Sequence, residues 1–146
     1  MTPAHQGGHG YPRPLLQRDA WTSLNGSWDF ALDTDGAWTL PAQVEWNRTI
    51  EVPFAPETER SGVRETGFHV ACWYRRRFTL PVGGGPTRVL LHFGAVDHSA
   101  VVWVDNRRVG SHEGGYTPFA FDITDACKPG LEHEVVVWAV DDPHDL

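Results

Sequence analysis

The stretch that decides the fold is RVLLHFGAVDHSAVVWVD, residues 88–105. Its first seven residues form one β-rich run, AVDHS is a loop, and AVVWVD (100–105) is a second run. The second run is apolar on both faces, which is the pattern of a central strand packed from two sides. We therefore expect a sheet with residues 100–105 in its interior.

Period-2 runs lie on both sides of this stretch. SWDFAL (27–32) alternates apolar with small or polar side chains, CWYRRRFTL (72–80) does the same, and EVVVWAV (134–140) ends before an Asp-Asp-Pro sequence. Helical periodicity is not sustained over any segment longer than ten residues. Seven or eight short strands with turns every 8–12 residues predict an all-β sandwich, most specifically a jelly roll of the galactose-binding-domain type.

The 146 residues are enough for one domain with a sizeable core. Residues 1–20 are punctuated by glycine and proline and are expected to form an N-terminal lead-in. Residues 21–146 are then expected to form the β-sandwich domain.

Charge and hydropathy exclude several partners. The formal net charge is −7 and the basic residues are scattered apart from Arg75-Arg76-Arg77, so no nucleic-acid partner is expected. Apolar runs of membrane length and the apolar core of a signal peptide are both missing, so we expect no membrane partner and a cytoplasmic location. For the arginine run, strand alternation places neighbouring side chains on opposite faces, which favours structural ion pairs over recognition of an acidic sugar.

The two cysteines and eight histidines show no metal-ligand spacing, so neither a metal nor a cofactor is expected. Cys72 and Cys127 are 55 positions apart, and we expect buried free thiols in preference to a disulfide. Cys127 precedes a Lys-Pro-Gly turn and is expected to be the less protected of the two. A disulfide would move the expected compartment outside the cytoplasm.

The segment HEGGYTPF (112–119) is predicted to be a shaped loop between two strands. Paired glycines allow positive φ or a close backbone approach, and a proline fixes φ while withholding an N–H donor. The predicted loop-shaping residues are Gly114, Gly115, Tyr116 and Pro118.

Four segments, WTSLNGSWDF, CWYRRRFTLP, the run from Leu91 to Thr124, and EVVVWAV, occur in an order that resembles the N-terminal sugar-binding domain of glycoside hydrolase family 2. That family includes β-galactosidases, β-glucuronidases and β-mannosidases. The resemblance spans roughly residues 14 to 142 and is most specific over Phe93 to Thr124. It implies a jelly-roll domain that precedes an immunoglobulin-like domain and a (β/α)₈ barrel with two catalytic glutamates.

A barrel needs about 250 residues, so the resemblance implies that this chain is a segment without catalytic residues. Its partners would be the carbohydrate substrate and the rest of the glycosidase chain. Asp97 falls where family β-galactosidases carry an asparagine that contacts the sugar, and β-glucuronidases keep a histidine like His98. Asp97 and His98 are therefore the predicted substrate-binding residues, and the alternative for Asp97 is a loop carboxylate that caps local N–H groups.

Within the family fold, Tyr116 and Phe119 are expected to be core or interface aromatics in preference to sugar-stacking platforms, and His112 a hydrogen-bonded structural histidine. Two other functions stay open. They are an independent carbohydrate-binding module and a structural or oligomer-contact domain. Seven tryptophans keep the module open, although Trp28, Trp103 and Trp138 sit in apolar strand patterns that suggest burial.

Overall fold

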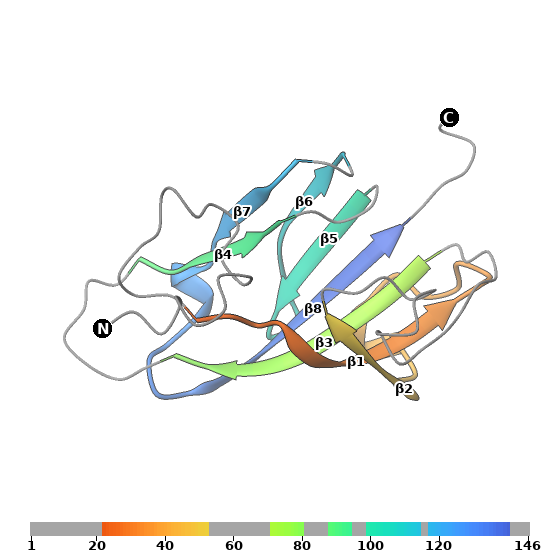
Figure 1. Cartoon of the computed structure of the whole chain (residues 1–146), viewed down its shortest axis with the longest axis horizontal. Helices are drawn as coiled ribbons and strands as arrows, with labels where there is room; N and C mark the ends of the chain where they lie inside the picture. Colours follow the sequence, from red (N-terminus) through yellow and green to blue (C-terminus); the bar gives the residue numbers. More distant parts are fainter. Residues whose placement is uncertain (1–21, 53–70, 81–87, 95–98, 115–116, 141–146) are drawn as a thin grey trace.

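The computed structural model describes residues 22–52, 71–80, 88–94, 99–114 and 117–140, and they form two antiparallel sheets (Figure 1). The larger sheet has six strands in the order β2-β1-β3-β8-β5-β6, and the smaller pairs β4 with β7. The strands are β1 (Gly26–Asp33), β2 (Arg48–Val52), β3 (Ala71–Thr79), β4 (Leu90–Phe93), β5 (Ser99–Val104), β6 (Arg107–Glu113), β7 (Phe119–Asp122) and β8 (Glu132–Val140). Two 3₁₀ turns, Pro41–Gln43 and Thr124–Ala126, complete the regular structure of the described residues. The all-β sandwich prediction is confirmed, while the lead-in predicted for residues 1–20 lies outside the described residues.

The central position predicted for residues 100–105 is also confirmed. Strand β5 lies between β8 and β6, with Val101 opposite Trp138 on one side and Ser111 on the other. Val102 and Val104 point toward the small sheet, whereas Trp103 points to the outer face of the large sheet. Both faces of this strand are covered, which explains why its sequence is apolar without alternation.

The sandwich core fills the space between the two sheets. Every second residue of β1 enters it, with Trp28 and Phe30 buried, and Tyr74 of β3 meets the Phe30 ring edge-on at 5.1 Å between ring centroids. The remaining buried members are Ile50, Leu91, Ala100, Val102, Val104, Ile123, Cys127, Val135 and Val137. The core therefore consists of side chains that the predicted period-2 alternation places on the inner faces of the strands.

The outer face of the large sheet carries a second apolar layer built on tryptophans. Trp73 stacks on Trp138 at 5.3 Å and on Trp103 at 5.5 Å between ring centroids. Trp38 and Trp46, from the connection between β1 and β2, pack against the same cluster. Trp73 is fully buried and Trp103 nearly so, whereas Trp138 stays partly exposed, so burial of this face depends on the β1–β2 connection as well as on the sheet.

Both cysteines are free thiols, but the expected order of protection is wrong. Cys127 is buried in the sandwich core, whereas Cys72 is only partly buried at the edge of that core. Cys127 directly follows the 3₁₀ turn Thr124–Ala126, and its side chain packs in the core cluster, which the turn sequence after it did not reveal.

In the part of the chain that the structure describes, no helix is long and apolar enough to cross a membrane.

Candidate functional site

Strand registers bring the two predicted loops to the same end of the sandwich. In the small sheet Phe93 pairs with Phe119, and in the large sheet Ser99 pairs with Glu113. The described residues that flank the two loops, Phe93, Ser99, Glu113 and Phe119, therefore lie at the same end of the sandwich, which we call the loop end (Figure 1). Sequence reasoning treated these loops as separate features, because strand pairing cannot be deduced from either loop.

Four of the predicted site residues lie outside the described residues. They are Asp97, His98, Gly115 and Tyr116. Their predicted roles therefore stay predictions, and the geometry of the site rests on the residues that flank them.

Gly114 and Pro118 are described, and both lie between β6 and β7. Gly114 has φ of +113°, a conformation that residues with a Cβ rarely adopt, and an added Cβ would lie 3.3 Å from the Thr117 hydroxyl oxygen. Pro118 is exposed and directly precedes β7, where a missing N–H donor costs nothing in the ladder. Substitution of Gly114 would thus strain the backbone of this loop.

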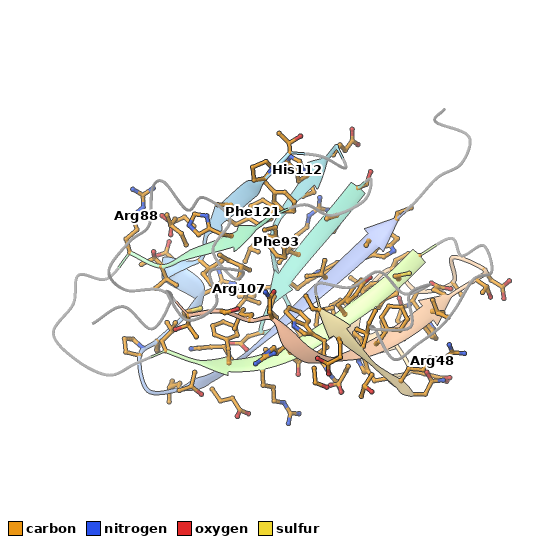
Figure 2. The ribbon with its side chains drawn as sticks, in the orientation of Figure 1. Arg48, Arg88, Phe93, Arg107, His112 and Phe121 are labelled. Atoms are coloured by element: carbon orange, nitrogen blue, oxygen red, sulfur yellow. The ribbon has the colours of Figure 1, made fainter. Side chains whose placement is uncertain are left out.

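A stack of aromatic rings from β4, β6 and β7 lies next to the loop end. The His112 ring lies parallel to Phe119 at 4.1 Å, and Phe119 stacks on Phe93 at 4.8 Å between centroids. Phe121 meets both phenylalanines edge-on. Figure 2 shows His112, Phe93 and Phe121 gathered where β6 approaches the small sheet. The expectation that Phe119 is a core aromatic agrees with its packing against the sandwich core.

His112 differs from its prediction. Its Nδ1 atom is buried and has no hydrogen-bond partner in the described part of the chain, so the ring is held by stacking and not by a hydrogen bond at that atom. A buried nitrogen without a partner is uncommon in folded proteins. The period-2 pattern of β6 gave no signal for this arrangement, because it depends on Phe119 from another sheet.

Gly110 is a further residue that sequence reasoning missed. A Cβ added there would overlap the ring of Phe121, so the absence of a side chain lets β6 approach β7 closely. The isolated glycine inside the strand pattern RRVGSHE was the available signal.

The opposite end of the large sheet is fastened by hydrogen bonds. The two-residue turn after β5 consists of Asp105 and Asn106, both at positive φ, as a type I′ hairpin requires. Asp105 accepts the Nδ1–H of His133 at 2.6 Å through Oδ2 and the amide of Glu134 at 2.9 Å through Oδ1. His133 Nε2 accepts the Lys128 amide at 2.9 Å, which places the imidazole proton on Nδ1 in the neutral ring. We call Asp105, Lys128 and His133 the clasp.

The clasp shifts the titration of its members. The hydrogen bond to Asp105 raises the pKa of His133, against the opposing effect of burial. Burial alone would raise the pKa of Asp105, but the hydrogen bonds from His133 and from the Glu134 amide outweigh it and lower that pKa. Burial, with a smaller effect of Asp105, raises the pKa of Cys127 to about 11. A thiol with that pKa is a poor nucleophile at neutral pH, so the arrangement is structural.

Among the described residues, no group of three or more histidine, cysteine, aspartate or glutamate side chains could hold a metal ion.

Comparison with known proteins identifies relatives of this domain. Residues 42–142 match the family described as glycosyl hydrolases family 2, sugar binding domain. The β-glucuronidase of Paenibacillus borealis is 31% identical over 137 residues, which are 87% of this chain and 22% of that protein. The β-galactosidase of Thermoanaerobacter pseudethanolicus is 37% identical over 93 residues, which are 63% of this chain and 12% of that protein.

Solved structures similar in fold to this chain also include β-glucuronidases. The structure of Faecalibacterium prausnitzii β-glucuronidase superposes with a TM-score of 0.69 and 30% identity, over 86% of this chain and 22% of that one. The chain thus spans about a fifth of the length of the β-glucuronidases that it matches.

Proposed function

This chain belongs to the sugar-binding domains of glycosyl hydrolase family 2, and from that membership we propose that it is the non-catalytic carbohydrate-binding part of a larger β-glycosidase. In this proposal, the loop that contains Asp97 and His98 completes the substrate pocket for hydrolysis of O-glycosidic bonds. The observation that carries the proposal is the family match over residues 42–142.

The enzyme type that we propose is a β-glucuronidase. The β-glucuronidase of Paenibacillus borealis aligns with 87% of this chain, against 63% for the β-galactosidase of Thermoanaerobacter pseudethanolicus. The broader alignment supports the glucuronidase type, with the galactosidase type as the alternative.

Catalysis is assigned to the remainder of the enzyme. A retaining glycosidase uses one carboxylic acid to protonate the leaving oxygen and one carboxylate to attack the sugar, about 5 Å apart. A barrel that carries such a pair needs about 250 residues. The role left for this domain is to contact sugar hydroxyls and to exclude water at the rim of the pocket.

Two structural features support a role for the loop end. The registers Phe93 with Phe119 and Ser99 with Glu113 bring the residues that flank the two predicted loops to one end of the sandwich, which supports the proposal. His112 and Phe119, which stack at 4.1 Å between ring centroids, lie close to the ends of the strands that flank the second loop. A loop whose flanking residues are packed in this way can present a polar side chain to a sugar with little loss of conformational entropy on binding.

The test is Asp97→Ala in the complete enzyme. A hydrogen bond to a charged group contributes about 1.5–3 kcal/mol, so kcat/KM for a β-glucuronide should fall roughly 10- to 100-fold while Tm barely changes. If Asp97 only caps local N–H groups, stability should instead fall by about 0.5–2 kcal/mol with normal kinetics.

Asp122→Ala is the matched control. Asp122 is the last residue of β7. It accepts the amide N–H of Thr124, at the start of the following 3₁₀ turn, at 3.0 Å and forms an ion pair with Arg88 at 3.2 Å. This variant should lower Tm and leave kcat/KM unchanged. If the two variants behave alike in both measurements, the substrate-contact role of Asp97 is excluded.

The 146-residue chain by itself should not hydrolyse nitrophenyl β-glucuronide or nitrophenyl β-galactoside. Turnover by the purified chain, shown to be free of host glycosidase, would contradict the assignment of catalysis to other domains.

A further inference from the structure

An open pocket of about 360 Å³ lies where β1 and β3 separate. The two strands pair from Asp29 opposite Arg75 to Asp33 opposite Ala71, whereas the first residues of β1 pair only with β2. The sheet therefore divides beside Asp29. The pocket is lined by Ser27, Trp28, Asp29, Arg75, Arg76 and Arg77.

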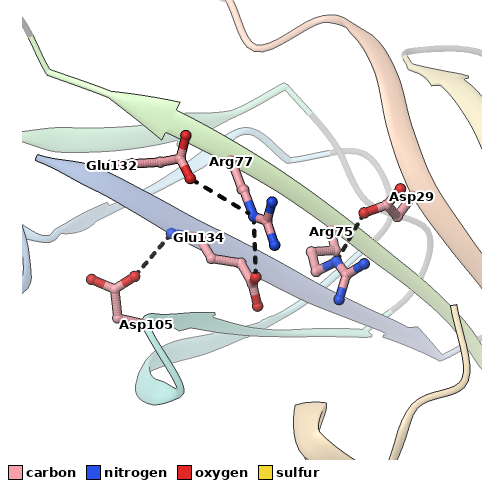
Figure 3. Close-up of polar contacts among 6 residues, drawn as sticks. All are labelled: Asp29, Arg75, Arg77, Asp105, Glu132 and Glu134. Carbon is pink, nitrogen blue, oxygen red and sulfur yellow. Dashed lines mark hydrogen bonds and ion pairs between the residues drawn. The ribbon is translucent and has the colours of Figure 1, made fainter.

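The division brings three consecutive arginines to one cavity. As the sequence predicted, Arg75 and Arg77 point to the same face of β3, where Figure 3 shows Arg75 paired with Asp29 and Arg77 between Glu132 and Glu134. Arg76 turns the other way and donates to the carbonyl oxygens of Leu24 and Asn25, at 3.0 Å each. In an unbroken sheet this alternation would keep Arg76 apart from its neighbours. Because β1 has left β3 here, all three arginines contribute to the lining of the same opening, although the Arg76 guanidinium is bound to backbone carbonyls on the other face.

The guanidinium of Arg75 is held in place but keeps free donors. Its Nε donates to Asp29 at 2.9 Å, and its planar group lies over the Trp46 ring at 4.6 Å from the centroid. These contacts fix the side chain by one nitrogen and one face. Neither Nη atom has a hydrogen-bond partner among the described residues, so up to four N–H groups remain for a ligand.

Arg77 is the most accessible of the three. Its Nε lies 3.9 Å from Glu132 and 3.9 Å from Glu134, at the outer limit of an ion pair, and its side chain is 65% exposed. Both glutamates belong to β8, on the side of β3 away from β1 and the pocket. Such a loose, exposed pair contributes little to stability, so Arg77 can turn toward a ligand at low cost.

The lining has an excess of positive charge in an acidic protein. The residues that line it include three arginines and one carboxylate, Asp29, although the whole chain carries a formal charge of −7. Two further carboxylates, Glu132 and Glu134, lie 3.9 Å from Arg77 outside the lining. Planar guanidinium groups bind carboxylate and sulfate groups through paired N–H donors. The Ser27 hydroxyl and the Asp29 carboxylate add a donor and acceptors of the kind that sugar hydroxyls need.

We propose that this pocket is a second carbohydrate site, which binds the anionic group of an acidic saccharide, a uronate carboxylate or a sulfate ester. The carbohydrate part of this inference rests on the proposed function, whereas the preference for an anion rests on the free donors of Arg75 and on the loosely paired Arg77. Arg75 and Arg77 contact the anion, and Asp29 and Ser27 contact neighbouring hydroxyl groups.

The pocket is separate from the loop end. Arg75 pairs with Val136, four residues before Val140, and Val140 pairs with Ser99 at the edge of the Asp97 loop. Four residues of strand span about 13 Å. A substitution at one place can therefore be tested without disturbing the other.

The experiment is a calorimetric titration of the 146-residue chain with a tetrasaccharide of galacturonate. We expect saturable binding tighter than about 1 mM, which weakens as NaCl is raised because exposed charges are screened. Arg77→Gln should weaken binding roughly 10-fold or more, the effect of one lost charged hydrogen bond. Arg75→Lys, which keeps the charge but not the planar fork, should weaken it as well.

The matched control is Arg88→Gln. Arg88 is likewise an exposed arginine, paired with Asp122 at 3.2 Å and placed beside the small sheet, away from the pocket. It should leave the Kd for the tetrasaccharide unchanged. The loop function is tested separately by kcat/KM of the complete enzyme, so that failure of the loop function and failure of this proposal are distinguished. Circular dichroism of each variant confirms that the sheet is intact.

Four results would overturn the proposal. They are the absence of binding to the uronate tetrasaccharide, equal losses in Arg77→Gln and Arg88→Gln, equally tight binding of neutral cellotetraose, and binding of the tetrasaccharide no tighter than that of free sulfate. Repetition with a sulfated, carboxylate-free oligosaccharide distinguishes the two anionic groups. Tighter binding of either saccharide than of free sulfate supports the site and names the group that it prefers.

Discussion

The two ends of the large sheet are held by different forces. At the loop end, His112, Phe119 and Phe93 form a ring stack, and the buried His112 Nδ1 has no partner in the described chain. At the clasp end, both oxygens of Asp105 and both nitrogens of His133 are hydrogen-bonded. The ring stack holds the loop end through apolar contacts. The clasp holds the turn after β5 through hydrogen bonds of Asp105 and His133.

The largest expected effect is Phe119→Ala at the loop end. Truncation of a buried phenylalanine costs about 3–5 kcal/mol, and Phe119 is only partly buried, so we expect a loss of about 2–4 kcal/mol in the free energy of unfolding. Urea unfolding measures this loss. Phe119→Leu, which keeps apolar volume but not the stack, should cost less. If both variants are as stable as the wild type, stacking does not hold this end.

The matching change at the clasp end is Asp105→Ala. It leaves the Glu134 amide and the His133 imidazole without their acceptor, and we expect a loss of about 1–3 kcal/mol in the free energy of unfolding at pH 6. Asp105→Asn keeps an acceptor and tolerates the positive φ, so it should cost less. An equal loss in both variants would show that the charge of Asp105, and not its hydrogen bonds, stabilises the turn.

The clasp should also make stability depend on pH. Folding raises the pKa of His133, so its contribution is complete below the unfolded value of about 6.5 and is lost as pH rises through the higher folded pKa. Folding lowers the pKa of Asp105, so its contribution is present above about 3.9 and is lost as pH falls through the lower folded pKa. The clasp is therefore most stabilising between about pH 4 and pH 6.5.

His133→Gln tests this dependence through urea unfolding at pH 6, 7 and 8. The wild type should lose stability relative to the variant as pH rises, with a slope below the one-proton limit of about 1.4 kcal/mol per pH unit. Parallel pH profiles for wild type and His133→Gln would exclude the clasp as a titrating element.

The smallest effect is a difference between the labelling rates of the two thiols. These rates measure how accessible each end of the sheet is, and the measurement does not require a change in stability. Cys72 pairs with Ala139 near the loop end and is partly exposed, whereas Cys127 lies near Asp105, is buried, and has a pKa of about 11. At pH 8 roughly one Cys127 thiol in a thousand is ionised. Labelling with a chromogenic disulfide, followed by mass spectrometry of peptides, should modify Cys72 first. Faster modification of Cys127 would mean that the clasp end opens more often than the loop end.

The sequence by itself determined the strands and the family resemblance. Alternation in SWDFAL and CWYRRRFTL, and the two-sided apolar run at 100–105, reflect which faces are buried, and that information is local. The order of four motifs indicated the sugar-binding family before any strand pairing was known, and the family match over residues 42–142 confirms it. The substrate contacts of Asp97 and His98 stay predictions, since these residues lie outside the described chain.

The tertiary structure alone decided which distant residues meet. Asp105 and His133 are 28 positions apart, and only the pairing of β5 with β8 brings them together. The stack of His112 on Phe119 requires contact between two sheets, and the burial of Cys127 requires contact with the core cluster. The pocket beside Arg75 requires the separation of β1 from β3. Periodicity reports which face of a strand is buried, but it carries no information about the partner that covers that face.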